Sequence, residues 1–433
     1  MRMQDLIEKK KNGFSHTGEE LQFIVGGAVS GSIPDYQLSA WLMAVCFRGM
    51  SDRELAVLTR LMASSGDMTD LSAFGDRTVD KHSTGGVGDK TTLVLVPLVS
   101  ELGGVVAKMS GRGLGFTGGT IDKLESIPNF RTELSSGEFV RMLKTHGACI
   151  AGQSGNLTPA DKKLYALRDV TATVDSIPLI ASSVMSKKLA TGARSIVLDV
   201  KTGNGAFMKD VENASALAEK MMAAGAAHGR SMRAVLTNMN IPLGNAVGNA
   251  LEVKEALEVL RGKGPCDLRE LCLVLATQML VLSVGGDETE LRLQCERALA
   301  DGSALRKFKE IVAAQGGDVS YIANSEKFPA AGAVYEIKAK KDGFLASMDC
   351  ALIGKTATLL GAGREKKGDH IDMSAGIVLV KKTGDFVRRG ETLAYLHTNR
   401  AEKLGEAELT YLSALVFSDS PVEKEPLIYR IIK

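Results

Sequence analysis

The first 66 residues consist of short amphipathic stretches that predict helices. Two capping boxes, each with a hydroxyl N-cap and a glutamate three positions later, precede apolar-periodic runs: Thr17 with Glu20 and Ser51 with Glu54. In the run after Ser51 the apolar side chains share one helical face, at Leu55, Leu58, Leu61 and Met62. Because three small helices bury little surface, we expect them to share a core with a later helical segment and with a second copy of the chain.

From about residue 79 the pattern changes to apolar runs that alternate with helical periodicity, which is typical of βαβ units and a mostly parallel sheet. The candidate strands are Val105–Met109, Ala148–Ala151, Ser195–Val200 and Met232–Asn238. The candidate helices include Asp89–Leu102, Ser136–His146 and Glu212–Ala227. An N-cap, a proline at the first helical position and an early acid then predict a helical insert over residues 158–191, at Thr158, Pro159 and Asp161.

From about residue 335 the chain shows short β-like segments separated by Gly-Asp and Gly-Glu turns. The candidate strands are Val334–Ile337, Leu345–Cys350, Gly376–Val380 and Leu393–His397. Residues 384–391 (GDFVRRGE) resemble the turn of barrel-sandwich hammerhead folds, which carry biotin or lipoyl groups. Because residues 380–382 are Val-Lys-Lys and not Met-Lys-Met, we expect a bracing β-rich domain without a covalently attached cofactor.

The predicted fold class is therefore α/β, with three domains. A small all-helical domain comprises residues 1–66 and 158–191, and a large, mostly parallel α/β domain comprises residues 79–152 and 195–330. The third domain, residues 335–433, is a hammerhead-like α+β domain rich in strands. A chain of 433 residues is long enough for two or three packed units.

Composition and charge exclude several classes of protein. The hydrophobic share of 45% and the charged share of 24% fit a soluble globular protein and exclude a disordered or collagen-like chain. A net charge of +2 is too small to hold a polyanion, so we expect no nucleic-acid partner. Residues 1–15 have no apolar signal-peptide core and no later stretch has the length of a membrane span, so we expect a cytoplasmic protein. The six cysteines lack metal-ligand spacing, and we expect them to be buried free thiols.

A glycine-rich segment, residues 80–89 (DKHSTGGVGD), lies directly before a predicted helix. Glycines allow the backbone to fold around an anion, the hydroxyls of Ser83 and Thr84 donate hydrogen bonds, and Lys81 adds charge. The free N–H groups at the start of the helix point at the same pocket. The segment has neither the Walker nor the Rossmann spacing, but its chemistry predicts a phosphate site.

A second glycine-rich segment, residues 108–125 (KMSGRGLGFTGGTIDKLE), begins at the end of a predicted strand. Ligands bind at the carboxyl ends of strands in open α/β sheets. Ser110, Thr117 and Thr120 place hydroxyl groups there among five glycines. Two such loops that face each other would enclose a tetrahedral oxyanion.

Together with residues 167–170 (LRDV) and 183–188 (SVMSKK), the two glycine-rich segments resemble the thymidine and pyrimidine-nucleoside phosphorylase family, over essentially the whole chain. The resemblance implies a homodimer in which a helical domain faces an α/β domain across a cleft. It implies phosphate on the α/β side, the nucleoside on the helical side and no organic cofactor. The expected reaction is reversible phosphorolysis of uridine, thymidine and deoxyuridine to free base and pentose 1-phosphate.

The family's site residues carry over position by position. The resemblance implies a phosphate site formed by Lys81, Ser83, Thr92, Lys108, Ser110 and Thr120. It implies a pyrimidine site at Arg168, Ser183 and Lys187, where the last two share a helical face and the guanidinium suits the O4 and N3 edge of the base. We expect Arg168 and Lys187 to stabilise charge on the departing base, and His82 to donate a proton or a hydrogen bond to its O2 atom.

The resemblance to the pyrimidine-nucleoside branch also implies a potassium ion, held by Gly88, residue 90, Leu243, Ala246 and Glu255. Residue 90 is Lys90, where the branch usually has threonine, and its ammonium group would compete with the ion. Backbone ligation would survive this change, so the ion remains expected. Phe116 replaces a histidine common in the family motif, which puts in doubt a polar role for that position.

Substrates on two domains imply a cleft that opens to load and closes to bring a phosphate oxygen within about 3 to 3.5 Å of C1′. We expect hinges near residues 66–80, 152–158 and 190–195. The plausible pivots are Gly152, Gly155 and Gly192.

Three alternatives remain. A thymidine-restricted phosphorylase is disfavoured by Lys108, because the bacterial thymidine branch tends to have an apolar residue there. An anthranilate-type phosphoribosyltransferase would need carboxylates that bind Mg²⁺, and no adjacent acidic pair lies in a glycine-rich loop. A catalytically inactive binding protein should have lost part of a set that is complete here: Lys81, His82, Arg168, Ser183 and Lys187.

Overall fold

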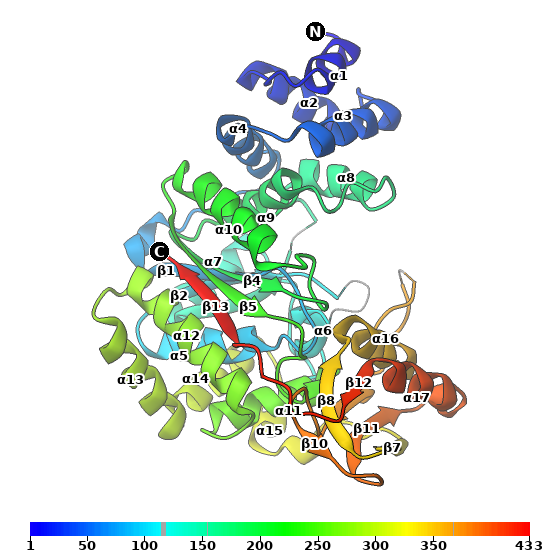
Figure 1. Ribbon diagram of the computed structural model, residues 1–433. Helices are drawn as coiled ribbons and strands as arrows, with labels where there is room; N and C mark the ends of the chain where they lie inside the picture. Colours follow the sequence, from blue (N-terminus) through cyan, green and yellow to red (C-terminus); the bar gives the residue numbers. More distant parts are fainter. Residues whose placement is uncertain (114–117, 154, 367) are drawn as a thin grey trace.

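The computed structural model describes residues 1–113, 118–153, 155–366 and 368–433. The helical region, at the top of Figure 1, contains four N-terminal helices and one later helix beside them. They are α1 (Met3–Lys11), α2 (Gly18–Ser30), α3 (Asp35–Arg48), α4 (Asp52–Ala63) and α8 (Pro159–Arg168). Both predicted capping boxes are confirmed, at the starts of α2 and α4. Leu21, Trp41 and Leu58 are fully buried in one core with Ala160 and Leu164 of α8.

Helix α9 (Ile177–Thr191) connects the helical region to the α/β region. Leu179, near its start, packs in the helical core, whereas Ala181 and Met185 pack with residues of the central sheet. The segment 158–191, predicted as part of the helical domain, therefore divides its packing between the two regions. This happens because α9 is apolar on more than one face and is buried along most of its length.

The central sheet has six strands in the order β13-β5-β4-β1-β2-β3. Five of them are parallel to one another: β1 (Thr78–Ser83), β2 (Val105–Ser110), β3 (Ala148–Gly152), β4 (Ser195–Thr202) and β5 (Ser231–Asn238). The strand order reverses at β1, which has β4 on one side and β2 on the other, so a crevice is expected at the carboxyl ends of these strands. The predicted α/β fold class is confirmed.

Strand β1 is absent from the strands that the hydrophobic pattern predicted. Its central residues Asp80, Lys81 and His82 are charged or polar, although the first two are almost completely buried. A pattern of apolar side chains cannot detect a strand whose buried positions are filled by paired charges.

Alternate side chains of the strands pack against two different helical layers. In β4, Ile196, Leu198 and Val200 pack with α9 and α10 (Val211–Ala226), whereas Val197 packs on the other side. The other layer contains α5 (Thr91–Glu101), α11 (Asn249–Leu260), α12 (Cys266–Ser283), α13 (Glu288–Ala300) and α14 (Ser303–Ala314). Three further helices complete this region: α6 (Thr120–Leu124), α7 (Ser136–His146) and α15 (Val319–Ala323).

The C-terminal region, at the lower right of Figure 1, combines two small antiparallel sheets with α16 (Cys350–Leu360) and α17 (Leu404–Ser413). The sheets have the orders β6-β9-β11-β7 and β10-β8-β12. Their strands are β6 (Ala246–Val247), β7 (Ala333–Lys338), β8 (Gly343–Met348), β9 (Gly376–Leu379), β10 (Phe386–Val387), β11 (Thr392–Thr398) and β12 (Leu415–Ser418). Because β6 precedes α11 in the chain, the α/β region contributes a strand to the C-terminal sheet.

The last strand, β13 (Ile428–Ile432), returns to the central sheet and pairs antiparallel with β5 (Figure 1). Residues 335–433 were all predicted to belong to the C-terminal domain. For β13 this prediction is wrong, because the strand belongs to the central sheet. Its pairing covers the N–H and C=O groups along the edge of β5, which would otherwise be an open sheet edge.

Two expectations drawn from composition can be compared with the structure. Within the described residues, no helix combines the length and the apolar character that crossing a bilayer requires. The six cysteines are free thiols in the described chain, and four of them are buried. The expected burial is wrong for Cys266, which is exposed at the start of α12, and for Cys46, which is half-buried.

The helical region contains a buried ion pair whose strength depends on pH. The Glu54 carboxylate accepts hydrogen bonds from Lys10 Nζ at 2.7 Å and from the backbone N–H groups of His16 at 2.7 Å and Ser51 at 2.9 Å. Burial alone would raise the pKa of Glu54, but these bonds outweigh burial and hold that pKa at about 2. The carboxylate therefore stabilises the fold above the unfolded pKa of 4.5, and this contribution is lost as the pH falls towards 2.

We predict that Glu54→Gln lowers the free energy of unfolding at neutral pH by about 3 kcal/mol, because the charge-assisted bonds are lost. The difference from the wild type should shrink as the pH falls from 4.5 towards 2. Urea unfolding followed across this range measures it, with Glu8→Gln on the exposed side of α1 as the control. A difference that does not change with pH would contradict the assignment.

Candidate active site

Two adjoining cavities open at the carboxyl ends of the central strands. The small cavity, about 200 Å³, lies between the loops that follow β1 and β2 and helix α9. The large cavity, about 740 Å³, lies between those loops and helices α8 and α9. The residues common to both linings are His82, Ser83, Gly85, Arg112, Gln153, Val184 and Lys187. Ligands in the two cavities would therefore face several of the same side chains.

The loop after β1 depends on glycine. Gly85 and Gly88 have φ angles of 94° and 75°, in the left-handed region that favours glycine. A Cβ atom on Gly86 would lie 2.7 Å from Met239 Cε, and one on Gly88 would lie 2.5 Å from the carbonyl oxygen of Leu243. The glycines therefore let this loop pack closely on the segment that follows β5.

The loop after β2 completes the small cavity. A Cβ atom on Gly119 would lie 2.1 Å from the backbone nitrogen of Gly113, so only glycine fits where the two arms of the loop meet. Arg112 lines the cavity and donates to the Glu125 carboxylate at 2.6 and 2.7 Å. Thr117 and Phe116 lie outside the described residues.

Five of the six residues expected at phosphate line the small cavity: Ser83, Thr92, Lys108, Ser110 and Thr120. Four of these residues supply hydroxyl groups from different loops and helices, and Lys108 supplies a buried ammonium group. The structure thus brings together most of the residues expected at phosphate, at the carboxyl ends of β1 and β2.

Asp80 holds two of the lysines at the small cavity. Its Oδ2 atom lies 2.7 Å from Lys188 Nζ, and its Oδ1 atom lies 3.6 Å from Lys108 Nζ. Burial, together with repulsion from Lys188, lowers the pKa of Lys108 to about 7. Lys108 is therefore only partly charged at neutral pH, and an anion in the small cavity would favour its charged form.

Lys81 is the exception among the expected phosphate residues, because among the described residues it lies outside both linings. Its Nζ atom lies 2.9 Å from Asp199 Oδ2 and donates to Thr91 Oγ1 at 2.7 Å. Burial opposes the charge, but Asp199 and Asp89 outweigh it and raise the pKa of Lys81. Neighbouring strand residues point to opposite faces of a sheet, so Lys81 turns away from the face on which His82 reaches the cavities.

His82 lines both cavities. Burial and the positive charges of Lys188, Lys108 and Lys81 lower its pKa well below the ordinary histidine value. The imidazole is therefore neutral at neutral pH and can donate one N–H hydrogen bond. Of the two roles expected for His82, hydrogen-bond donation is favoured over proton donation.

The large cavity has mainly apolar walls. They include Leu157, Tyr165, Val174, Ile180, Phe207 and Leu217. All three residues expected to hold the pyrimidine also line this cavity: Arg168, Ser183 and Lys187. A cavity with apolar walls and a few convergent polar groups is the usual form of a small-molecule site.

Lys187 lies where the two cavities meet. Its ammonium group contacts the Asp161 carboxylate of α8 and donates to Ser183 Oγ at 3.0 Å. The side chain of Asp161 is 6% exposed, so this ion pair is largely shielded from water. The pair fixes the Lys187 ammonium group between α8 and α9 and connects the two helices.

Arg168 is held by the chain that connects α8 to α9. Its guanidinium donates to the carbonyl oxygens of Thr173 at 3.2 Å, Val174 at 2.7 Å and Leu179 at 3.0 Å. Three of its five N–H donors are used in this way, which leaves two for a ligand. Burial lowers the pKa of Arg168, but an arginine stays charged.

Three of the residues expected to bind potassium, Leu243, Ala246 and Glu255, surround the ammonium group of Lys90, whereas the carbonyl oxygen of Gly88 accepts the backbone N–H of Lys90 at 3.0 Å. Lys90 Nζ donates to the carbonyl oxygens of Leu243 at 3.1 Å and Ala246 at 2.7 Å, and lies 2.5 Å from Glu255 Oε2. These oxygens are already occupied by the ammonium group and do not fit an additional cation. Throughout the described ranges, no three or more His, Cys, Asp and Glu side chains are grouped to hold a metal ion.

Several residues of the site were not predicted from the sequence. Lys188 follows the assigned Lys187, and its partner Asp80 precedes the assigned Lys81. Their charges were the only features of the sequence that could have indicated a role in the site. Asp161 was used only as an early helical acid, and Gln153 and Tyr165 carry no sequence signal for a ligand. These positions become recognisable only when β1, α8 and α9 are placed together.

Three family profiles match the chain. Residues 4–66 match "Glycosyl transferase family, helical bundle domain", residues 75–305 match "Glycosyl transferase family, a/b domain", and residues 344–417 match "Pyrimidine nucleoside phosphorylase C-terminal domain". The chain is 54% identical over 430 residues to a pyrimidine-nucleoside phosphorylase of Geobacillus stearothermophilus, which covers 99% of both chains. It is 56% identical over 401 residues to one of Bacillus subtilis, covering 92% of this chain and 93% of the relative.

A solved structure of anthranilate phosphoribosyltransferase from Thermus thermophilus has a similar fold, with a TM-score of 0.57. The match covers 72% of this chain and 99% of that chain, at 16% sequence identity. At this identity the similarity concerns the fold alone.

We predict that sulfate, used as a probe for the small cavity, binds more weakly as the pH rises through about 7, because Lys108 loses its charge in the free protein. Calorimetry measures the affinity, and sulfate keeps its double charge throughout. In Lys108→Met the affinity should be lower and the step near pH 7 should disappear. The same step in this variant would assign the titration to another group.

We predict different effects for two buried lysines, Lys188 at the small cavity and Lys81 on β1. Lys188→Met should weaken sulfate binding about tenfold or more, because a charged donor at the cavity is worth about 1.5 to 3 kcal/mol, and should also lower thermal stability, because Asp80 loses a counter-charge. Lys81→Met should mainly lower thermal stability, because Asp89 and Asp199 lose a buried counter-charge. Calorimetry and thermal unfolding of both variants separate the two roles. Equal losses of sulfate affinity would place Lys81 at the anion.

Proposed function

The chain belongs to the pyrimidine-nucleoside phosphorylase family, and we propose that it catalyses reversible phosphorolysis of uridine, thymidine and deoxyuridine. The observation that carries the proposal is the pair of adjoining cavities, one small and rich in lysine and one large and mainly apolar. Phosphate matches the first in charge and size, and a pyrimidine nucleoside matches the second. The residues common to both linings would lie at the reacting atoms.

On the phosphate side, the cavity offers the hydroxyl groups of Ser83, Thr92, Ser110 and Thr120. Lys108 and Lys188 add positive charge, and helix α5 begins at Thr91, with the positive end of its dipole at the same end. Binding of a phosphate dianion would offset the repulsion between the two lysines, so phosphate and the charged form of Lys108 stabilise each other.

On the nucleoside side, the apolar walls would contact the faces of the pyrimidine ring. Arg168, Ser183 and Lys187 would bind its polar edge, with the unused N–H donors of Arg168 directed at the acceptor O4 and the Ser183 hydroxyl available to accept from N3–H. Asp161 and the carbonyl oxygens that hold Arg168 position these groups, so little side-chain order must be created on binding.

The reaction balances without a covalent intermediate on the protein. A phosphate oxygen forms a bond to C1′ while the C1′–N1 bond breaks and its electron pair moves to the base. The proton carried by hydrogen phosphate ends on the base, which gives a free pyrimidine and a pentose 1-phosphate. The protein has to orient the two substrates and stabilise the negative charge that grows on the base.

His82 and Lys187 line both cavities and would therefore lie beside this charge transfer. The neutral imidazole of His82 would donate its N–H to O2 of the departing base. The ammonium group of Lys187 would stabilise the base anion electrostatically, in a site largely closed to water.

A thymidine-restricted activity is the second candidate. Lys108 at the end of β2 favours the broad activity, because the family resemblance associates an apolar residue there with restriction to thymidine. The anthranilate-type alternative has only a similarity of fold in its favour. It would also leave the nucleoside-binding set of the large cavity without a role.

We also propose that the chain acts as a homodimer whose cleft closes. Tyr36 and Phe47 of α3 are 73% and 79% exposed, which supports a subunit contact on the helical region. Gly192 ends α9 with a φ of 90°, and a Cβ atom there would lie 2.2 Å from the carbonyl oxygen of Thr69. These features fit a pivot at the border between the helical and α/β regions.

We predict release of free base from uridine, thymidine and deoxyuridine in the presence of phosphate, and no release from inosine. Chromatography of the products measures it, with phosphate omitted as the control. Cleavage of inosine without cleavage of uridine would overturn the substrate assignment. Cleavage of thymidine alone would support the second candidate.

Lys187 provides the mechanistic test. Lys187→Met should lower kcat about 100-fold or more and also lower thermal stability, because it leaves Asp161 buried and unpaired. The double variant Lys187→Met with Asp161→Asn should regain stability without regaining kcat. If the double variant recovers kcat, Lys187 acts only through the structure. Lys163→Met, which removes an exposed pair with Asp35, is the control.

A further inference from the structure

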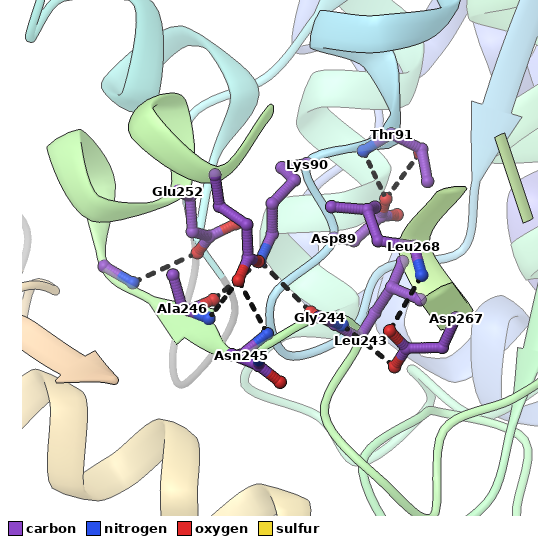
Figure 2. A network of polar contacts seen from close by, with 12 residues as sticks. Asp89, Lys90, Thr91, Leu243, Gly244, Asn245, Ala246, Glu252, Asp267 and Leu268 are labelled. Carbon is purple, nitrogen blue, oxygen red and sulfur yellow. Dashed lines mark hydrogen bonds and ion pairs between the residues drawn. The ribbon is translucent and has the colours of Figure 1, made fainter. Parts of the chain in front are cut away.

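The ammonium group of Lys90 lies in a site built from oxygen atoms. Two backbone carbonyls, of Leu243 and Ala246, and one carboxylate oxygen of Glu255 surround it at 2.5 to 3.1 Å. Figure 2 shows Lys90 extended from the loop after β1 towards the segment that carries Leu243 and Ala246. The side chain of Lys90 is fully buried. Backbone carbonyls that replace a hydration shell are also how proteins coordinate potassium.

The backbone around this site is shaped for a cation. Glu255 uses its second oxygen, Oε1, to accept the N–H groups of Asn245 at 2.9 Å and Ala246 at 3.1 Å. Gly244 has a φ of 67°, and a Cβ atom there would lie 2.2 Å from Glu255 Oε2 and 3.1 Å from Lys90 Nζ. The turn 243–246 is therefore folded to present its oxygens to one positive charge and has no room for a further side chain.

The neighbouring charges are also paired one to one. Lys123 lies 2.7 Å from Glu252, and its Nζ atom donates to the carbonyl oxygen of Asp89 at 2.7 Å. Lys382 lies 2.6 Å from Asp267, a residue that also accepts the N–H of Gly244 (Figure 2). With Lys90 and Glu255, three ammonium groups face three carboxylates. A free cation would have to bind against an ammonium group, with none of these carboxylates left to pair it.

We propose that Lys90 is a built-in replacement for a monovalent cation, so that this chain holds the loop after β1 (residues 84–90, the anion loop) in place without potassium. An ammonium group and a potassium ion have the same charge and similar size, and both are held by carbonyl and carboxylate oxygens. The covalently attached cation cannot dissociate, and no translational entropy is lost in bringing it from solution.

The Lys90 site is connected to the small cavity through the backbone. Lys90 lies between Asp89 and Thr92, which both line that cavity, and its N–H donates to the carbonyl oxygen of Gly88 at 3.0 Å. On the other side, the 243–246 segment continues into β6, which pairs with β9 of the C-terminal region. Lys90 is therefore a positioning residue that connects the anion loop to two other parts of the fold.

The wild-type protein gives the first test. Its thermal midpoint and its sulfate affinity should be the same in potassium chloride and in choline chloride of equal ionic strength. Equilibrium dialysis with rubidium, a probe for potassium, should show no saturable binding. Saturable rubidium binding, or a midpoint raised by potassium but not by choline, would overturn the proposal.

Two variants give the second test. Lys90→Ser removes the ammonium group and leaves the oxygens free, so its midpoint and sulfate affinity should fall in choline and recover in potassium, with one rubidium ion bound per chain. Lys90→Met fills the space without charge and should show neither recovery nor binding. Lys340→Ser, at an exposed position, is the control.

A Lys90→Ser variant that folds but does not respond to potassium would show that the oxygens do not form a cation site, and would overturn the proposal. If this variant does not fold in choline, folding in potassium alone is the supporting result, and failure in both salts is the opposing one. Sulfate binding and thermal unfolding need no turnover, so a failure here is distinct from a failure of the proposed phosphorylase activity.

Discussion

Charge pairing at the carboxyl ends of the central strands is the interaction on which the rest of this structure depends. Asp80 of β1 is completely buried and holds Lys108 of β2 and Lys188 of α9 at the small cavity. A buried carboxylate or ammonium group is costly unless it is paired, so these strands and this helix must come together for any of the charges to be tolerated. The same pairs leave positive charge available on one side, towards the cavity, and this charge would favour an anion there.

Helix α9 connects these charge pairs to the residues expected to bind the nucleoside. It packs in the helical core near Leu179 and on the central sheet near Met185, and between and beyond these points it presents Ser183, Lys187 and Lys188 to the two cavities. A single helix thus carries side chains that face both the expected phosphate and the expected base. Closure of the proposed cleft would bring a phosphate oxygen close to C1′, as phosphorolysis requires.

The C-terminal region also supports the site, although none of its described residues lines either cavity. It is connected to the α/β region by β6 and by β13, and the β6 connection begins at the turn that Lys90 holds. Lys90 is a permanent cationic partner for the carbonyl oxygens of that turn, and the same contacts fix the backbone of the anion loop. Exchanging a diffusible ion for a side chain makes this contact independent of the ionic conditions.

The sequence by itself determined the fold class and the capped helices, because local periodicity and N-cap chemistry depend on neighbours in the chain. Of the six residues that the family resemblance assigned to phosphate, five line the small cavity. The sequence could not show that β1 is a strand, since the buried positions after Val79 carry the paired charges Asp80 and Lys81 and not apolar side chains. Only the tertiary structure decided that Lys81 faces Asp199 and not the cavity, and that β13 returns to the central sheet. It also decided that Lys90 fills the site expected for an ion. Each of these depends on which segments, distant in the chain, lie within a few ångströms of one another, and no local pattern contains that information.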